Sequence, residues 1–204
     1  MIVAPGAIVT LLRGVDLVAA PWKNGGGVTR EVAAFPAGSG LDAFVWRVSI
    51  ADVAQAGPFS RFAGIDRTLV LLSGAGMLLD EAQGPTHALT QPLDIARFAG
   101  ETAIDARLVN GATRDFNLMV RRGAATGELE VWRSEGGAST TPHHSLSADI
   151  VLLFCAAGSL EVMLGDAAPV TLAADDTLHI EAPEALTCKI SGEGALLAIR
   201  LHYA

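Results

Sequence analysis

The chain has little of several features that define common protein classes. Only 18% of its 204 residues are charged and half are hydrophobic, which indicates a sizeable core and argues against disorder. No apolar run approaches the ~18–20 residues that cross a bilayer. The apolar start MIVAPGAIVTLL lacks the basic residues and the long hydrophobic run of a signal peptide. These absences predict a cytoplasmic protein with no membrane partner.

Cysteine is scarce, and so is positive charge in one part of the chain. Cys155 and Cys188 lie in apolar, strand-like runs and are expected to be buried free thiols. The net charge of −8 argues against a nucleic-acid partner. Residues 1–122 hold 11 basic and 11 acidic residues, whereas residues 123–204 hold 3 and 11. Because nearly all the basic residues are arginine, the first part is predicted to carry a local anion site, with solvated surface charge as the alternative.

Helical periodicity is also scarce, being limited to one or two possible turns in 13–20, and strand signals dominate. FVWRVSI (44–50) and DFNLMVR (115–121) alternate between apolar and polar faces. RTLVLLSGAGMLLD (67–80) is typical of two strands joined by a hairpin loop at 73–76. Many short strands indicate a β-sandwich or β-barrel. Further strands are predicted near 95–99, 104–109, 129–133, 150–155, 160–164, 177–180, 186–190 and 196–203.

A weak internal repeat predicts a doubled architecture. The stretch DRTLVLLSGAGML from Asp66 aligns with DIVLLFCAAGSLEV from Asp149, and two later pairs of strands align at similar separations of 81 to 83 residues. The division predicted from it is an N-terminal barrel at 1–122, which holds the ligand site, and a C-terminal barrel at 123–204. The polar stretch 134–148 is the expected connector.

Several kinds of catalytic site find no support. No His-x-His pair with a nearby Glu occurs in the first half, and the alternatives at His143-His144 or at His179, Glu181 and His202 are weak, so no metal is expected. There is no Gly-x-Ser-x-Gly elbow, and KNGGGVTRE lacks the Gly-Lys-[Ser/Thr] ending of a phosphate loop. No catalytic residue and no cofactor are predicted.

What remains is a polar set in the first half. It includes the glycine triplet Gly25–Gly27, whose alternative interpretation is a bulge or tight turn. Asn117, Met119 and Arg121 share one strand face, and an arginine pointing into a barrel would require a partner. The alternative is that neighbouring charges are structural ion pairs that secure turns, namely Asp66–Arg67 and Asp115–Arg121.

Four motifs in this set resemble a known family. PWKNGGGVTRE, WRVSIADV, GPFSRFAGIDRTLVLLSGAGMLL and DFNLMVRR, in this order and spacing, are similar to the HutD/Ves family of bacterial proteins. The match covers most of residues 10–122 and departs from the usual motif at Ala63, where the family typically has proline. The resemblance implies an all-β bicupin fold, with two cupin-like β-barrel (jelly-roll) halves and no cupin metal triad. A homodimer is expected because bicupins often pair through open sheet edges.

The resemblance also implies a role in histidine utilisation, through binding of the small carboxylate metabolite N-formylglutamate. Arginine side chains are suited to bind the carboxylates of this ligand, and asparagine side chains to bind its formamide. Glycine N–H groups can bind an anion, and aromatic rings can form the apolar walls of the pocket. Two alternatives stay open: an amide hydrolase or isomerase with Glu31 or Asp115 as general base, and a structural or protein-binding module. The residues expected to bind the ligand are Lys23, Asn24, Gly25, Gly26, Thr29, Trp46, Arg47, Arg61, Phe62, Asn117, Met119 and Arg121.

Overall fold

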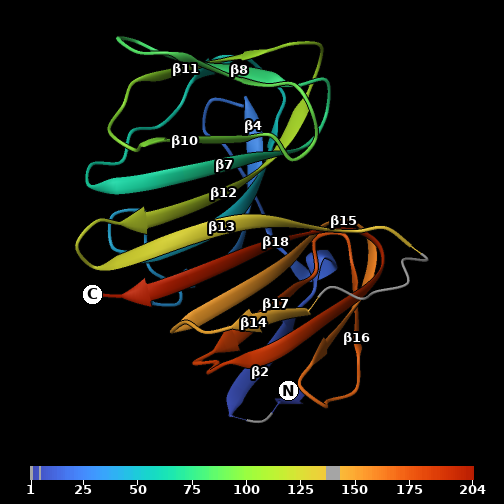
Figure 1. The fold of residues 1–204 in the computed structure, drawn as a ribbon. Helices are drawn as coiled ribbons and strands as arrows, with labels where there is room; N and C mark the ends of the chain where they lie inside the picture. The colour runs from blue at the N-terminus through green and yellow to red at the C-terminus, as the bar shows by residue number, and fades with distance from the viewer. Residues whose placement is uncertain (1, 5, 137–142) are drawn as a thin grey trace. The chain divides into compact units, whose positions relative to one another are not determined.

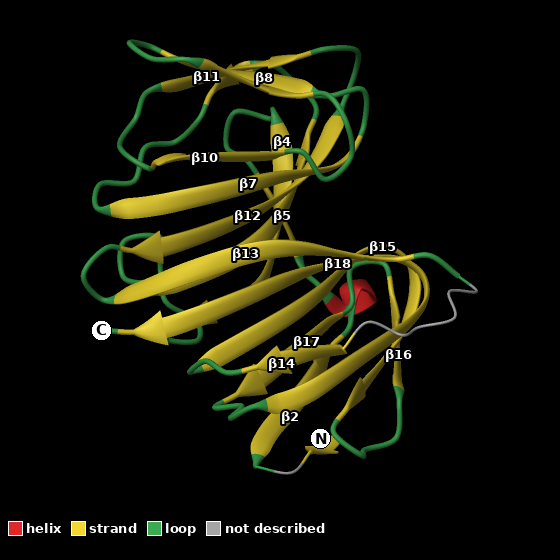
Figure 2. Cartoon of the chain, in the orientation of Figure 1, coloured by secondary structure: helices red, strands yellow, loops and turns green. Residues whose placement is uncertain are grey.

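The computed structural model describes residues 2–4, 6–136 and 143–204, which form strands joined by turns and one short 3-10 helix (Figures 1 and 2). The chain divides into two compact units. Residues 17–125 form the N-terminal unit, and residues 126–204 form the C-terminal unit together with residues 1–16. No helix among the described residues is long and apolar enough to span a membrane.

The N-terminal unit consists of two antiparallel sheets. The six-stranded sheet has the order β10-β7-β12-β5-β4-β3, and the four-stranded sheet has the order β6-β11-β8-β9. The strands of the first are β3 (Ala19–Pro21), β4 (Gly27–Phe35), β5 (Trp46–Val53), β7 (Ile65–Ser73), β10 (Ile95–Ala99) and β12 (Thr113–Arg121). Those of the second are β6 (Gly57–Pro58), β8 (Met77–Glu81), β9 (Thr86–Leu89) and β11 (Ile104–Leu108).

The C-terminal unit is built on one eight-stranded sheet. Its path is β1-β2-β17-β15-β18-β13, with β14 paired to β18 and β16 paired to β15. The elements are β1 (Ile2–Ala4), β2 (Ala7–Leu12), the 3-10 helix η1 (Gly14–Asp16), β13 (Ala125–Ser134), β14 (His143–Leu146), β15 (Ile150–Leu164), β16 (Val170–Ala173), β17 (Thr177–Glu181) and β18 (Leu186–Tyr203).

The two units differ from the division expected at 122/123 chiefly at the N-terminus. Residues 1–16 belong with the C-terminal unit because β2 pairs with β17 along five residues. At the other boundary the structure divides the chain only three residues later, at 125/126. In the expected connector, β13 ends at Ser134 and β14 begins at His143, while residues 137–142 lie outside the described residues.

Two features of the strand prediction were wrong. The segment 67–80 does form two strands, but β7 pairs with β10 and β12 whereas β8 pairs with β9 and β11, so no hairpin joins them. Instead the turn carries the chain from one sheet to the other through Gly74, where φ is +99° and a Cβ would lie 2.6 Å from the Ala112 carbonyl oxygen. In the C-terminal unit, the four strands predicted within 150–164 and 186–203 are two long strands, β15 and β18.

Each of the two long strands corresponds to two strands of the N-terminal unit. The beginning of β15 pairs with β17 and the end of β18, as β7 pairs with β10 and β12. The end of β15 pairs with β16 and the beginning of β18, as β8 pairs with β9 and β11. A bulge in β15 between Cys155 and Ala157 stands where the N-terminal unit has its turn. The two units therefore share one pairing order.

A turn that occurs in both units shows which residue of one unit corresponds to which residue of the other. Leu71 N donates to Asp94 O at 3.0 Å, and Leu93 N donates to Leu71 O at 2.7 Å. Cys155 has the same two bonds with Asp176 and Asp175, at 2.9 and 2.8 Å, and both Leu93 and Asp175 have φ of 74°. Leu71 thus corresponds to Cys155, one residue away from the alignment that starts with Asp66 on Asp149. Because side chains alternate between the two faces of a strand, a shift of one residue in the alignment matches inward residues of one unit with outward residues of the other.

Each unit has its own apolar core. In the C-terminal unit the core includes both cysteines, which are buried and free, as the sequence predicted. In the N-terminal unit the core cluster joins inward residues of both sheets, among them Leu69 and Leu71 of β7 and Leu79 of β8. These core residues define which face of each strand points into the unit.

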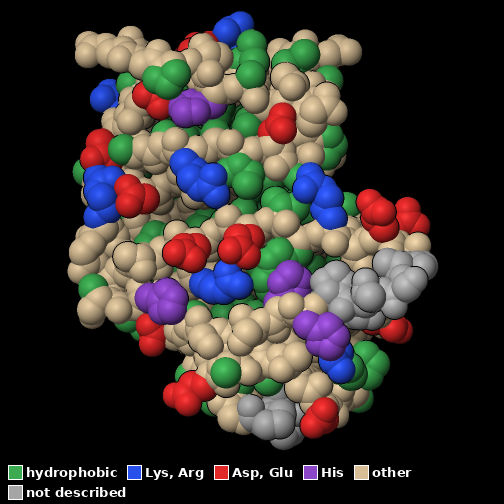
Figure 3. Space-filling model, in the orientation of Figure 1, with side chains coloured by type: hydrophobic (Ala, Val, Ile, Leu, Met, Phe, Trp, Pro, Cys, Tyr) green, Lys and Arg blue, Asp and Glu red, His purple; other side chains and the backbone are tan. Residues whose placement is uncertain are grey.

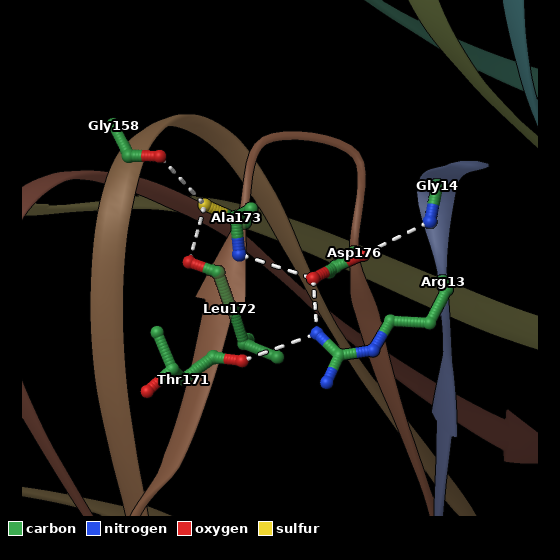
Figure 4. A network of polar contacts seen from close by, with 8 residues as sticks. Arg13, Gly14, Gly158, Thr171, Leu172, Ala173 and Asp176 are labelled. Atoms are coloured by element: carbon green, nitrogen blue, oxygen red, sulfur yellow. Dashed lines mark hydrogen bonds and ion pairs between the residues drawn. The ribbon is translucent and has the colours of Figure 1, made fainter.

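A buried carboxylate ties the N-terminal segment to the C-terminal unit (Figure 4). Asp176 accepts hydrogen bonds from Arg13 Nη1 at 2.7 Å, Gly14 N at 2.9 Å and Ala173 N at 3.1 Å. Burial works to raise the pKa of Asp176, but these bonds outweigh it, so its pKa lies below the ordinary value. The interaction therefore contributes stability above about pH 4 and loses it as the carboxylate is protonated in acid.

We predict that Asp176→Ala lowers the free energy of unfolding by about 2–4 kcal/mol, because two backbone N–H groups lose their acceptor. Urea denaturation followed by circular dichroism measures this change. The control is Arg13→Ala, whose side chain is 46% exposed and which should cost about 1 kcal/mol or less. Equal losses in the two variants would contradict the central role of Asp176.

Candidate functional site

The inward face of the six-stranded sheet carries a cluster of polar side chains in an otherwise apolar interior. Strand register places Asp115 opposite Leu71, Asn117 opposite Leu69, and Met119 opposite Arg67. Because Leu69 and Leu71 belong to the core, all of these side chains point inward. On the other flank of β12, Ser49 and Arg47 of β5 continue the rows of Asn117 and Met119. The alternation predicted for 115–121 and for 45–50 is confirmed, but Phe44 was placed on the wrong face, because it precedes β5 and packs with Ile65 and Met119.

Arg67 is the most deeply placed cation of this face, with only 6% of the residue exposed. Its guanidinium lies over three rings, at 5.4 Å from Phe59, 5.7 Å from Phe62 and 5.0 Å from Phe98. Burial lowers its pKa to about 10, the charge of Asp115 opposes this shift, and the charge of Arg47 adds to it. Its hydrogen bond goes to the Ser60 carbonyl at 3.3 Å, and its Nε has no partner.

Two acceptors on β12 are also unpaired. Asp115 is 1% exposed and its Oδ2 makes no hydrogen bond, and neither does Asn117 Oδ1. Burial raises the pKa of Asp115 to about 7, Arg67 opposes this shift, and Asp52 adds to it. Arg67 and Asp115 act on each other only through their charges, without a hydrogen bond, and the row of Asn117 lies between them in the register. One inward face therefore offers a buried donor and two buried acceptors, each of which is costly to leave unsatisfied.

Arg47 connects this buried group to the outside. Its Nε donates to Glu31 Oε2 at 2.7 Å and its Nη1 to Ser49 Oγ at 3.1 Å. The Arg47 side chain is 12% exposed and that of Glu31 is 39% exposed. Solvent exposure therefore increases along the cluster, from the buried Arg67 and Asp115 to the pair of Arg47 and Glu31, which solvent can reach.

The C-terminal unit shows that the shared fold does not require a polar interior. From the equivalence of Leu71 and Cys155, the residue in register with Leu71, Asp115, corresponds to Leu196. The same face is followed by taking every second residue along the strands. On it Arg67 corresponds to Val151, Asn117 to Ala198, and Phe98 to Ile180. Leu196, Ala198, Val151 and Ile180 all belong to an apolar core. The polar residues of the N-terminal unit are thus specific to it.

Where the C-terminal unit does place polar groups on its inward face, they satisfy one another. Arg200, the counterpart of Met119, contacts Glu130 at 3.2 Å and lies over Trp132. Trp132 Nε1 donates to Glu130 at 3.0 Å, and the His144 ring stacks on Trp132 with 3.6 Å between centroids. This cluster leaves no group available of the kind found at Arg67.

Most other arginines of the N-terminal unit are held in surface ion pairs. Arg122 contacts Asp66 and Glu101, Arg107 contacts Asp80, and Arg30 contacts Asp52. The face drawn in Figure 3 accordingly shows acidic and basic side chains interspersed, without a patch of one sign. The alternative of structural pairs Asp66–Arg67 and Asp115–Arg121 was wrong, because Asp66 pairs with Arg122, and Arg121 donates to the backbone oxygens of Asp42 and Phe44.

The residues expected to bind a ligand fall into two groups. Thr29, Arg47, Asn117 and Met119 lie on the inward face, and Phe62 joins them beneath Arg67. Arg121 also shares the face of Met119 by register, but its guanidinium donates to the backbone oxygens of Asp42 and Phe44. The others are placed elsewhere: Lys23, Asn24, Gly25 and Arg61 are exposed, Gly26 is buried in a turn, and Trp46 lies on the opposite sheet face stacked on Phe35.

The glycine triplet forms a tight turn between β3 and β4. Gly25, at φ +70°, donates its N–H to Trp22 O at 3.0 Å, and Gly26 N donates to Asn24 Oδ1 at 3.0 Å. At Gly27 a Cβ would lie 2.5 Å from the Asp52 carbonyl and 3.1 Å from the Trp22 ring. The N–H groups of Gly25 and Gly26 are therefore used within the turn. The turn positions Trp22, whose Nε1 donates to Thr29 Oγ1 at 2.7 Å.

Sequence reasoning missed Arg67, Phe59 and Phe98 as members of this site. Arg67 was interpreted together with its neighbour Asp66, although the alternation of β7 places it on the face of Leu69 and Leu71. That alternation was a signal available in the sequence. Phe98 carried no comparable signal, because its nearness to Arg67 depends on the pairing of β10 with β7.

The fold and this site define an all-β, cupin-like protein with a polar cluster inside its N-terminal unit. The HutD family model matches residues 15–198, and the chain belongs to the HutD family, as the motifs indicated. A 21.2 kDa protein of Pseudomonas putida, described as uncharacterized and located in the hutC 3′ region, is 38% identical over 190 residues, 93% of this chain and 96% of that one.

Solved structures agree with this assignment. HutD from Pseudomonas fluorescens SBW25, in a formate condition, superposes with a TM-score of 0.83 at 32% identity, over 97% of this chain and all of that one. A mutant of the oxalate decarboxylase OxdC of Bacillus subtilis matches with a TM-score of 0.61 at 8% identity, covering 95% of this chain and 78% of that chain, which shows the fold alone. The predicted cupin-like fold class is confirmed.

We predict that replacing the buried charges together costs little stability. In Arg67→Met/Asp115→Leu, apolar side chains fill the space, and the free energy of unfolding should stay within about 1 kcal/mol of the native value or rise. Arg67→Met alone removes the charge that favours ionised Asp115 and should cost about 1–3 kcal/mol at pH 8. Urea denaturation measures both. A double variant weaker than the single one would show that the cluster serves stability.

We also predict that Asp115 makes stability depend on pH. Its native pKa of about 7 exceeds the ordinary 3.8, so the native protein holds an extra proton between about pH 4 and 7. The free energy of unfolding should therefore fall as pH rises through this window, by a few kcal/mol, and level off above it. Asp115→Asn should remove this slope, whereas the exposed control Asp105→Asn should retain it. An unchanged slope in Asp115→Asn would contradict the assignment.

Proposed function

We propose that the N-terminal unit binds a small organic acid that also carries a neutral N–H donor, most simply N-formylglutamate. The observation that carries this proposal is the unpaired buried set of Arg67 Nε, Asp115 Oδ2 and Asn117 Oδ1 on one inward face. A carboxylate of the ligand accepts from Arg67, with Arg47 adding positive charge from the neighbouring row. The ligand N–H donates to an acceptor on β12.

The chemistry of N-formylglutamate matches this set. Its formamide N–H is attached to the carbon that bears the α-carboxylate, so donor and anion are adjacent. Register likewise places Asn117 one row from Arg67, on the next strand. The rings of Phe59, Phe62 and Phe98 supply apolar contact to the aliphatic part. The C-terminal unit, with its apolar interior, has a supporting role.

The biological role proposed here is to tune histidine utilisation by sensing this metabolite. Its support is membership of the HutD family and the description of the Pseudomonas putida relative by its position beside hutC. A binding protein suits this role because occupancy follows the concentration of the metabolite without consuming it.

One observation favours a second candidate function, that of an amide hydrolase. Asp115, with its pKa raised to about 7, is suited to take a proton from water that attacks the formyl carbon. The attack would break the C–N bond, and the amine would leave with a proton, releasing formate and glutamate. The isomerase and the protein-binding module gain no comparable support.

We predict that calorimetric titration detects binding of N-formylglutamate by the native chain. Arg47→Ala and Arg67→Met should each weaken it at least tenfold, because each loses a charge-assisted contact. The matched control is Arg107→Ala, an exposed arginine on the four-stranded sheet, which should bind like the native protein. Arg61→Ala should also retain binding, since its side chain is exposed.

Product analysis of the same mixtures separates the two candidates. Incubation of N-formylglutamate with catalytic amounts of protein should leave it unchanged if the chain is a receptor. Release of formate that disappears in Asp115→Asn would support the hydrolase instead. Native protein that shows neither binding nor turnover would overturn both.

A further inference from the structure

The four-stranded sheet contributes a second polar pair to the inside of the N-terminal unit. His87 of β9 is in register with Leu79, and Glu81 of β8 is in register with Ile104. Leu79 and Ile104 both belong to the core, so His87 and Glu81 point inward. His87 Nε2 lies 2.8 Å from Glu81 Oε1, and the two side chains are 22% and 20% exposed. No pattern in the sequence indicated this pair.

Phe98 links this pair to the cluster on the other sheet. The His87 ring lies 6.1 Å from the Phe98 ring, which also lies 5.0 Å from the guanidinium carbon of Arg67. Phe59 also lies against this guanidinium, and its backbone N–H donates to Ile104 O at 2.9 Å. Ile104 is the register partner of Glu81. Arg67 is therefore linked to His87 through the Phe98 ring and to the strand of Glu81 through Phe59 and Ile104.

The surroundings of His87 leave one ring nitrogen available. Within the described part of the chain its contacts are with Glu81 and Phe98, and Nε2 alone has a hydrogen-bond partner there. The contact with the Glu81 carboxylate fixes the orientation of the ring. Among the described residues, the other charged groups on inward faces are Arg67, Arg47, Arg121, Glu31 and Asp115, and all three arginines lie on the opposite sheet, where Arg121 is engaged by the backbone of Asp42 and Phe44. When both ring nitrogens carry a proton, Nδ1–H is a donor to an anion that is separate from the two arginines.

We propose that His87, positioned by Glu81, binds the distal carboxylate of a dicarboxylate ligand whose other end is held at Arg67. This inference rests on the proposed function and deepens it, because it assigns the ligand class as an N-acyl amino acid with an acidic side chain. The ring centroid of His87 and the Arg67 guanidinium are at most about 11 Å apart through Phe98. The carboxylates of a glutamate skeleton, with a hydrogen bond of roughly 2.8 Å at each end, suit a separation of this order.

The test compares two ligands that differ only at the distal end. N-formylglutamate and N-formylnorvaline, in which a methyl group replaces the side-chain carboxylate, are titrated calorimetrically into the native chain and His87→Gln. The native chain should favour N-formylglutamate at least tenfold, and His87→Gln should lose most of this preference while binding N-formylnorvaline as before. Glu81→Gln should reduce the preference in part. His202→Gln, an exposed histidine of the C-terminal unit, is the matched control and should change nothing.

The ratio of the two affinities distinguishes recognition from a structural role, since a misfolded site weakens both ligands equally. An unchanged ratio in His87→Gln overturns the assignment of His87 while native binding of N-formylglutamate still supports the proposed function. Equal loss of both ligands in His87→Gln also overturns the assignment. A native chain that binds neither ligand removes the proposed function, and this inference falls with it.

Discussion

The constraint on which the structure depends is the desolvation of charge inside the N-terminal unit. Arg67 and Asp115 are almost fully buried, without an ion pair between them. Burial lowers the pKa of Arg67 and raises the pKa of Asp115, so it favours the neutral form of each. A charge in such a place persists only with compensation from its surroundings. Three aromatic rings and one carbonyl provide part of this for Arg67. The uncompensated remainder, at Nε and at the β12 acceptors, is what points to a ligand.

The two units separate what the fold needs from what the site needs. They share a pairing order and a turn with matching hydrogen bonds, yet Val151 and Leu196 stand where Arg67 and Asp115 stand. Apolar side chains can therefore occupy the positions of Arg67 and Asp115 in the same arrangement of strands. The polar inward cluster of the C-terminal unit around Arg200 and Glu130 is internally satisfied. Selection for stability alone does not explain the difference.

Alternation along single strands was predictable from the sequence, whereas relations between strands were not. The faces of Arg47 and Asn117 followed from period-2 patterns in runs that are apolar on one side. Arg67 was missed because an adjacent Asp66 offered a simpler local partner. The inward position of His87 depends on its register with Leu79 and on the core membership of that residue. No pattern within THAL expresses this.

The charge balance of the interior favours an anionic ligand whose nitrogen is neutral. With its pKa near 7, Asp115 is only partly ionised at neutral pH, and Glu31 is already engaged by Arg47, so Arg67 is left as the dominant charge. A free amino acid would bring an ammonium group into this positive interior, and burying an ammonium costs far more than burying an amide N–H. Acylation of the nitrogen removes that cost and keeps the donor that Asn117 can accept. The same balance explains why the acceptors and the cation lie on one face.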